Sequence, residues 1–261
     1  MKILAKVMVA AILMLFVILV QVSWAKNSET IKLRALFQQN VGNIPIEADY
    51  WQDVKSYALK TISGIGADFN VSQYFVYVDR NPQKQFIFVC YYDAKSRDIS
   101  LIGADKVSTG NPARGRGFFI TPLGVYKNTV DIIGYRALGT KNDKNWRGYG
   151  IKGMRIWDFG WRRSQDGRGT IVDIRLLMHA TDPDFGEQRL GSVDSKGCIR
   201  ISHRLNRFLD HYGILDKEFE ASKDSKKIKW LLRADREPVA YAGKYIIVGS
   251  SGFKNSNLKR P

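Results

Sequence analysis

Short runs of β-branched and aromatic residues, separated by turn-forming residues, occupy the middle of this chain. Such runs favour strands, and several in succession favour a sandwich or barrel over a helical bundle. The runs cover residues 74–78, 85–92, 101–102, 106–110 and 171–178. A turn-forming Asp-Arg-Asn-Pro sequence follows the first run. We therefore expect a mainly β protein.

Helical patterns flank this β-rich part. Trp51, Val54 and Ala58 have the spacing of one helix face, and Ser202 and Gly213 are suitable cap and stop residues for a second helix. The predicted elements are helices over 50–62, 203–212 and 226–233 and a closing strand over 238–249, before a tail from Gly252 that should fray. The expected fold class is α+β, mainly β with flanking helices.

Composition along the chain divides it into four parts. They are a leader over 1–25, an N-terminal helical extension over 26–70, a catalytic domain over 71–205, and C-terminal helices with a closing strand over 206–261. Residues 115–168 are rich in Gly, Arg and aromatics, so we expect substrate-binding loops and a lid there.

The amino terminus has the pattern of a secretory signal peptide. Lys2 and Lys6 precede an apolar run over 7–20, and Ser23 and Ala25 are small residues at the cleavage-determining positions. The run is shorter than the roughly 20 residues that span a bilayer, which favours cleavage after Ala25. A retained anchor stays open, since residues 21–22 lengthen the run. The pattern predicts an exported, periplasmic or envelope protein.

The net charge predicts attraction to anionic surfaces. The formal charge is +16, and removing the two leader lysines leaves 16 − 2 = +14. In an exported protein the partners for this field are acidic wall polymers, phospholipid or lipopolysaccharide head groups, rather than nucleic acid. Solvated lysines on an ordinary soluble protein are the plainer alternative for any one basic run.

The two cysteines have different sequence surroundings. Cys90 lies in an aromatic and β-branched run and is expected to be a small core hydrophobe. Cys198 follows glycine between Lys196 and Arg200, a setting that lowers a thiol pKa. A disulfide between the two stays possible, because export permits it.

Acyl transfer through a thioester needs a thiol nucleophile and an imidazole base, and Cys198 and His179 supply these two groups. An imidazole takes the thiol proton, and backbone N–H groups around Gly197 and Cys198 stabilise the oxyanion. Arg200 offers a planar fork to a carboxylate, with an ion pair to Asp194 as the structural alternative. The residues predict a cysteine acyltransferase.

Four segments occur in the order found in L,D-transpeptidases of the YkuD type, which the chain resembles over about 74–205. They are Thr-Pro-Leu-Gly-Val-Tyr at 121–126, His-Ala-Thr at 179–181, Leu-Gly at 190–191 and Ser-Lys-Gly-Cys-Ile-Arg at 195–200. The resemblance implies a YkuD-like β-sandwich that cleaves the bond between the third and fourth residues of peptidoglycan stem peptides and transfers the acyl group to an amine. It implies no metal or organic cofactor.

Residue roles carry over by matching position. The resemblance makes Cys198 the nucleophile and His179 the general base and acid, with the backbone carbonyl of Ala180 orienting the imidazole. Arg200 would meet a substrate carboxylate, and Ser195 and Thr181 join it in the expected substrate-binding set.

The chain departs from the family pattern at Lys196, where many members have histidine, and at Ala180, where glycine is usual. His203 is the reserve base, and His211 is expected at the surface. A zinc site from His179, Cys198 and Asp182 or Asp184 matches no familiar ligand spacing.

Three functions remain open from the sequence. The acceptor is a second stem peptide or a protein amine in a transpeptidase, or water in an L,D-carboxypeptidase. A wall-binding protein without turnover is the third. The aromatic residues of the 146–161 region have two open interpretations. They form either a groove wall for glycan or peptide, or ordinary packing in the core and at its rim. The residues are Trp146, Tyr149, Trp157, Phe159 and Trp161.

Overall fold

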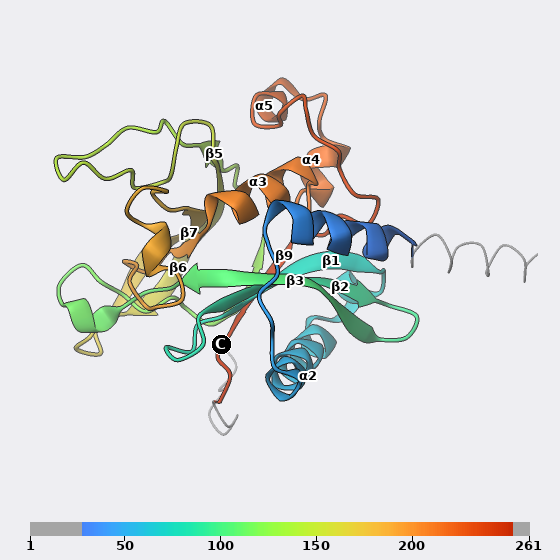
Figure 1. Cartoon of the computed structure of the whole chain (residues 1–261), viewed down its shortest axis with the longest axis horizontal. Coiled ribbons are helices and arrows are strands. Elements are labelled where there is room, and N and C mark those ends of the chain that lie inside the picture. Colours follow the sequence, from blue (N-terminus) through green and yellow to red (C-terminus); the bar gives the residue numbers. More distant parts are fainter. Residues whose placement is uncertain (1–27, 253–261) are drawn as a thin grey trace, which may run out of the picture.

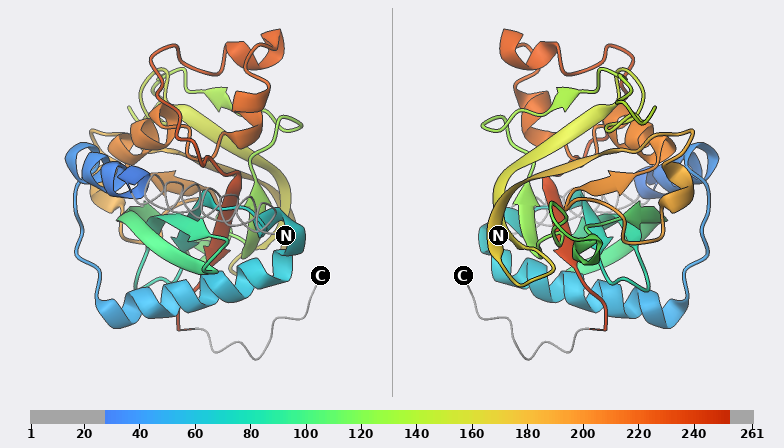
Figure 2. Two further views of the ribbon diagram at one scale, coloured as in Figure 1. Left: turned by 90° about the vertical axis from the view of Figure 1, so that its right-hand side faces the viewer. Right: turned by 90° about the vertical axis from the view of Figure 1, so that its left-hand side faces the viewer.

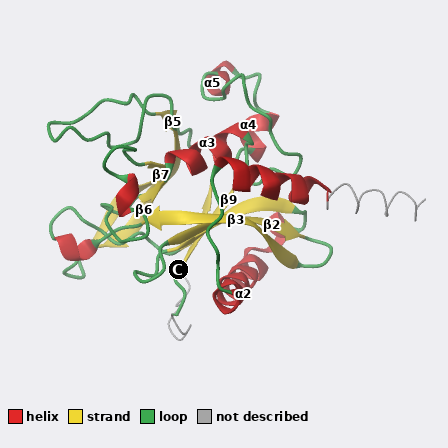
Figure 3. Cartoon of the chain, viewed as in Figure 1, coloured by secondary structure: helices red, strands yellow, loops and turns green. Residues whose placement is uncertain are grey.

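A computed structural model describes residues 28–252 (Figure 1). Strands occupy the middle of the molecule and helices surround them (Figure 3). The strands are β1 (Gln73–Asp79), β2 (Phe86–Asp93), β3 (Asp98–Ser108), β4 (Gly124–Lys127), β5 (Tyr135–Arg136), β6 (Arg155–Gln165), β7 (Ile171–Ala180), β8 (Ile199–Ile201) and β9 (Tyr245–Gly249). The helices are α2 (Ala48–Ile65), α3 (His203–His211), α4 (Lys217–Ala221) and α5 (Lys226–Lys229), with short 3₁₀ turns η1 (Gly66–Phe69), η2 (Pro112–Arg114) and η3 (Glu187–Arg189). Residues 28–40 are also helical.

All nine strands join one sheet in the order β4-β9-β1-β2-β3-β8-β7-β6-β5. The long strand β3 links its halves, because eight of its first nine residues pair with β2 while Val107 and Ser108 pair with β8. One hydrophobic cluster draws on both halves, with Val76 and Val89 from one and Trp157 and Met178 from the other. This arrangement confirms the expected mainly β fold with flanking helices.

Helices cover both sides of the first half of the sheet (Figures 1 and 2). Tyr50, Val54, Ala58 and Ile62 form the buried stripe of α2, which packs on a second cluster containing Phe75 and Cys90. Every residue of β1 is buried as a result. A strand buried on both faces is a near-continuous apolar run, which is why it could be recognised in the sequence.

The helical residues 28–40 pack against β3 and α3 on the other side. The ring of Phe37 lies 5.0 Å from that of Phe208. It also rests on Gly103, where a Cβ atom would come within 2.1 Å of the ring. Ser202 caps α3 by accepting a hydrogen bond from the Leu205 N–H, as its sequence position predicts.

Several elements differ from the sequence predictions. The two short runs around 101–110 form one strand, β3, and the predicted strand over 238–249 begins only at Tyr245. The helix expected over 226–233 ends at Lys229. Residues 155–165, expected as loop, form the eleven-residue strand β6. Its paired neighbour β7 stabilises it through backbone hydrogen bonds, which do not depend on side-chain polarity.

The expected division at residue 205 does not coincide with a structural boundary. It cuts α3, and it separates β9 from the sheet in which β9 lies between β4 and β1. The C-terminal part is therefore built into the same sheet as the predicted catalytic domain.

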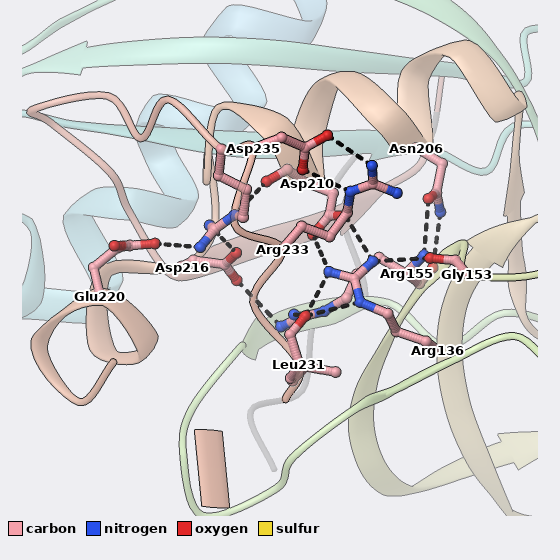
Figure 4. A network of polar contacts seen from close by, with 11 residues as sticks. Arg136, Gly153, Arg155, Asn206, Asp210, Asp216, Glu220, Leu231, Arg233 and Asp235 are labelled. Carbon is pink, nitrogen blue, oxygen red and sulfur yellow. Dashed lines mark hydrogen bonds and ion pairs between the residues drawn. The ribbon is translucent and has the colours of Figure 1, made fainter. Parts of the chain in front are cut away.

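Buried charges attach this C-terminal part to β5 and β6 (Figure 4). Arg136 binds Asp210 through two contacts of 2.8 and 3.0 Å. Arg155 is fully buried 3.4 Å from Asp216, and Arg236 binds the other oxygen of Asp216 at 2.7 Å. Removing one partner of such a pair leaves an uncompensated buried charge, so the network holds the C-terminal segment firmly in place.

No helix among residues 28–252 is both long and apolar enough to cross a membrane. The predicted leader over 1–25 and the tail beyond Gly252 lie outside the described residues.

Candidate active site

His179 lies near the end of β7, and Cys198 immediately precedes the adjacent parallel strand β8. In the β7–β8 ladder Met178 is opposite Ile199, and His179 is opposite Arg200. Met178 and Ile199 belong to the main core. Because side chains alternate along strands, His179 and Arg200 are directed to the other side of the sheet, and the same alternation carried back one strand position beyond Ile199 directs Cys198 to that side as well. On this extrapolation, strand spacing and rise put the Cα atoms of His179 and Cys198 roughly 8 Å apart.

The Cys198 thiol is partly exposed and packs against a small apolar cluster that includes Ile156 and Leu177. Its Sγ lies 3.9 Å from the carbonyl oxygen of Arg175. Within residues 28–252 no hydrogen bond joins Sγ to the imidazole of His179. Burial raises the pKa of the thiol, while the Leu177 N–H and the charge of Arg200 oppose that rise. The resting group is therefore a neutral thiol.

His179 is held in one tautomer. Its Nδ1 lies 2.7 Å from the carbonyl oxygen of Ala180, and a carbonyl only accepts hydrogen bonds, so Nδ1 carries the proton and Nε2 has the free lone pair. The ring is 3% exposed and the Tyr149 ring meets it edge-on at 4.8 Å. Burial, reinforced by Arg200 and opposed by the Ala180 contact, lowers the pKa of His179 to about 4.

Ser195 shapes the turn that carries the thiol. Its hydroxyl donates to the Cys198 carbonyl at 2.5 Å and accepts from the Gly197 N–H at 3.0 Å. Ser195 is fully buried, and its hydroxyl contacts lie within the turn; its expected contact with substrate stays a prediction. The Gly197 N–H donates to Ser195 in this conformation, and its expected role at the oxyanion also stays a prediction.

The Thr-Pro-Leu-Gly segment braces the same turn from a distant part of the sequence. Thr121 donates from Oγ1 to the Gly197 carbonyl at 2.9 Å and accepts from the Gly110 N–H at 2.8 Å. A Cβ atom on Gly110 would lie 1.9 Å from the Phe119 carbonyl oxygen. Only glycine fits this close approach of three backbone segments.

Arg200 is bound to Asp194, the structural alternative to a substrate carboxylate. Its Nη1 lies 3.1 Å from the Asp194 carboxylate and 3.3 Å from that residue's backbone carbonyl oxygen. Arg114 and Arg189 bind the same carboxylate. Three guanidinium groups around one carboxylate leave an excess of two positive charges beside the thiol turn.

Two of these arginines are open to solvent. Arg114 and Arg189 have side-chain exposures of 43% and 48%. Each also covers an aromatic ring, Phe118 at 4.9 Å for Arg114 and Trp146 at 5.0 Å for Arg189. A guanidinium has five N–H donors, so both keep donors for an anionic ligand.

Thr181, expected to contact substrate, is 1% exposed and lies under the turn over 182–186. Its backbone N–H donates to the Ile201 carbonyl, which continues the β7–β8 pairing past the strand end. The side chain is therefore covered in this conformation, and its expected substrate-binding role stays a prediction.

The segment over 137–153 lies against His179. Its backbone is tied to Asp182, whose carboxylate accepts from the Arg147 N–H at 2.7 Å, and the Arg147 side chain binds Asp184 at 2.7 Å. Gly150 has φ +82°, and a Cβ there would lie 2.9 Å from the Ala180 methyl group. These contacts place Tyr149 on the imidazole ring.

The alternative site residues lie elsewhere. His203 Nδ1 contacts Glu187 at 2.5 Å at the start of α3, and His211 meets the Tyr212 ring edge-on at the end of the same helix. The Lys196 ammonium lies 5.7 Å from the Phe118 ring. Cys90 and Cys198 are both free thiols. Among residues 28–252 no group of three or more His, Cys, Asp or Glu side chains is arranged to hold a metal.

The aromatic residues of the 146–161 region divide between surface and core. Trp157 and Phe159 are buried in the main core, while Trp161 is 63% exposed. Of these aromatic residues, Trp146 and Tyr149 therefore lie beside the candidate site, where they contact Arg189 and His179, respectively. Sequence reasoning missed Arg114 and Arg189 as site residues, because only folding brings them to Asp194.

Comparisons with known proteins give little to carry over. No family model and no curated protein matches this sequence. Among solved structures, the chain is similar to the helical cell shape determining protein Pgp2 from Campylobacter jejuni, at 14% sequence identity and a TM-score of 0.33. The similarity covers 76% of this chain and 56% of that one. The chain spans little more than half of that protein, and the likeness is too weak to carry its fold or role across.

Proposed function

We propose that this protein is an exported cysteine acyltransferase of the L,D-transpeptidase type, acting on peptidoglycan stem peptides. One observation carries the proposal: Cys198 leads directly into β8, whose parallel neighbour β7 carries His179, and Nδ1 of His179 contacts the Ala180 carbonyl. That contact leaves Nε2 as a base directed away from the backbone. The proposal includes a YkuD-like fold and rests there on the order of the sequence motifs.

The chemistry follows from these groups. Nε2 takes the thiol proton while Sγ attacks the carbonyl carbon of the scissile peptide bond. The tetrahedral intermediate then loses its C–N bond, and the imidazolium gives its proton to the departing amine. An acceptor amine attacks the thioester carbonyl and gives a proton to the imidazole. The C–S bond then breaks, and the imidazolium returns the proton to the departing thiolate, which regenerates the Cys198 thiol and the neutral base.

The resting protonation states support concerted proton transfer. A thiol with a raised pKa and an imidazole with a pKa of about 4 do not form a stable ion pair at neutral pH. Proton transfer must therefore accompany attack on the carbonyl. Because the Gly197 N–H is used by Ser195, we assign the oxyanion to the Cys198 N–H.

The arginines around Asp194 support an acidic substrate. Arg114 and Arg189 each have one ion pair and large exposed fractions, while Arg200 is more buried. We assign substrate carboxylates to Arg114 and Arg189, and a positioning role on the thiol turn to Arg200.

The test is mass spectrometry of muropeptides incubated with the purified protein. We expect new crosslinks or shortened stems with the wild type and with Cys90→Ala, and neither with Cys198→Ala. Intact-mass measurement should show a carbapenem adduct on Cys198 in the first two proteins only. Turnover by Cys198→Ala, or no turnover and no adduct in the wild type, contradicts the proposal.

A second arm identifies the acceptor. Adding an excess of acceptor stem peptide should produce dimers if an amine is used, whereas stems shortened by one residue indicate water. Export rests on the leader pattern over 1–25, and the mature chain recovered from the cell envelope should begin at Lys26.

A further inference from the structure

A cavity separate from the thiol lies between α3 and the chain over 152–154. Its volume is about 460 Å³, and its walls include Arg204 and Arg207 of α3 and Lys152 opposite them. Met154 lines it as well and also belongs to the apolar cluster against which Cys198 packs. Met154 is thus common to the cavity wall and to the apolar cluster beside Cys198.

Three cationic side chains of this cavity form no ion pair. Lys152, Arg204 and Arg207 are exposed, and no ion pair within residues 28–252 involves any of them. The Asp105 carboxyl lies in electrostatic range of Arg204 but is not in ion-pair contact with it; it accepts a hydrogen bond from Ser202 at 2.5 Å.

The acidic residues of the cavity are already neutralised. Asp210 binds Arg136, and Asp235 binds Arg233 through contacts of 2.8 and 2.7 Å. Figure 4 shows both pairs beside each other. Three cations without an ion-pair partner among the described residues therefore line one hollow, and a ligand that carries two or more negative charges complements them.

We propose that this cavity binds a phosphate-bearing small molecule or head group. A phosphate monoester carries about −1.5 to −2 charges at neutral pH, against −1 for a carboxylate. Its three oxygens match the planar forks of two arginines, with the lysine as a further point charge. The volume accommodates a phosphate together with an attached sugar-sized group.

The site is independent of the acyl-transfer chemistry. Its cationic residues belong to α3 and the 152–154 segment, and the nucleophile turn lies at 195–198. Binding should therefore persist in Cys198→Ala, so failure of this proposal and failure of the proposed function are distinguishable.

The test is calorimetric titration of the full-length protein with pyrophosphate and glucose 6-phosphate, with citrate as a carboxylate probe and sodium chloride at matched ionic strength. We expect saturable binding of the phosphate probes and weaker binding of citrate. Arg204→Gln/Arg207→Gln should weaken phosphate binding by about tenfold or more, because two charge-assisted hydrogen-bonding groups are lost. Both substitutions are at exposed helix positions, and circular dichroism should confirm an unchanged fold.

The matched control is Lys226→Gln/Lys227→Gln, which removes the same charge from exposed positions of α5. It should bind pyrophosphate like the wild type. Equal weakening in the two double variants shows a general charge effect and overturns the site. No binding by the wild type, or tighter binding of citrate than of pyrophosphate, also overturns it.

Vesicles containing phosphatidylglycerol distinguish the two sources of phosphate. Loss of vesicle binding in Arg204→Gln/Arg207→Gln, but not in the control, supports a lipid head group as ligand. Unchanged vesicle binding together with lost pyrophosphate binding supports a soluble phosphoester.

Discussion

Cys90 and Cys198 are the same side chain in two differently built parts of one sheet. Cys90 lies within β2, under α2, where apolar packing surrounds it and burial alone raises its thiol pKa. Cys198 lies where β8 begins, beside a braced turn, with a backbone N–H and an arginine that oppose the effect of burial. The thiol at the strand end is thus both partly exposed to solvent and in contact with polar groups that affect its pKa, whereas the thiol in the strand centre is neither.

The two halves of the sheet that contain these cysteines also differ in burial. β1 is buried along its whole length, whereas the early part of β7 alternates between exposed and buried positions and only its end is fully buried. Four predictions test this contrast, beginning with the largest effect.

The largest expected difference between the two thiols is in their rates of alkylation. Cys90 reacts only when the protein unfolds, and a stability of 5 kcal/mol or more makes that state rarer than about one in a thousand. We expect iodoacetamide at pH 8.5 to modify Cys198 at least about a thousandfold faster, as measured by peptide mass spectrometry. Similar rates at both positions contradict the contrast.

Acid should lower the free energy of unfolding through His179, which lies in the half of the sheet that contains the candidate site. The pKa of His179 falls from its ordinary 6.5 to about 4 on folding, so the unfolded chain binds the proton more readily. Its contribution is present above pH 6.5 and is lost as pH falls toward 4, by about 3 kcal/mol over that window. Urea unfolding at several pH values measures it. His179→Gln should unfold with a correspondingly smaller pH slope, and an unchanged slope contradicts the assignment.

Serine replacements should have opposite consequences at the two cysteines. Cys90→Ser places a hydroxyl in an apolar cluster, and we expect a loss of about 1 to 3 kcal/mol in unfolding free energy with muropeptide turnover retained. Cys198→Ser should change stability by less than about 0.5 kcal/mol and abolish carbapenem acylation. Urea unfolding and intact-mass spectrometry give the two readouts.

The smallest effect concerns the braced turn. Ser195→Ala removes two hydrogen bonds, and a net loss of about 1 kcal/mol in turn positioning corresponds to about fivefold slower acylation of Cys198 by a carbapenem. Ser63→Ala, which removes an exposed hydroxyl bonded within α2, is the control and should acylate at the wild-type rate. Equal rates in the two variants argue against the bracing role.

The strands could be predicted where burial makes their composition apolar. Residues 74–78 and 85–92 are such cases: β1 includes the whole first run, and β2 includes the second from Phe86 onward. β6 was missed because Arg155 and Asp158, buried through ion pairs with distant residues, give it the composition of a loop. β8 has only three residues, too few for a periodic signal.

The candidate site was predictable in its residue types and less so in its contacts. Motif order singled out Cys198 and His179, and the Ala180 carbonyl lies where a partner of the imidazole was expected. The roles of Ser195 and Gly197 depend on each other and on Thr121, 74 residues before Ser195. Hydrogen bonds between such distant positions leave no local pattern in a single sequence.

The position of β9 bears on how the molecule is made. This strand is formed by residues 245–249, yet it lies beside β1 and is parallel to it, with Val76 opposite Ile246. The 165 residues from 80 to 244 are synthesised after β1 and before β9 can fill the gap between β1 and β4. Until then two strand edges stay unpaired and open to aggregation, so completion of the sheet must await residues 245–249, and a nascent chain halted before residue 245 should depend on chaperones.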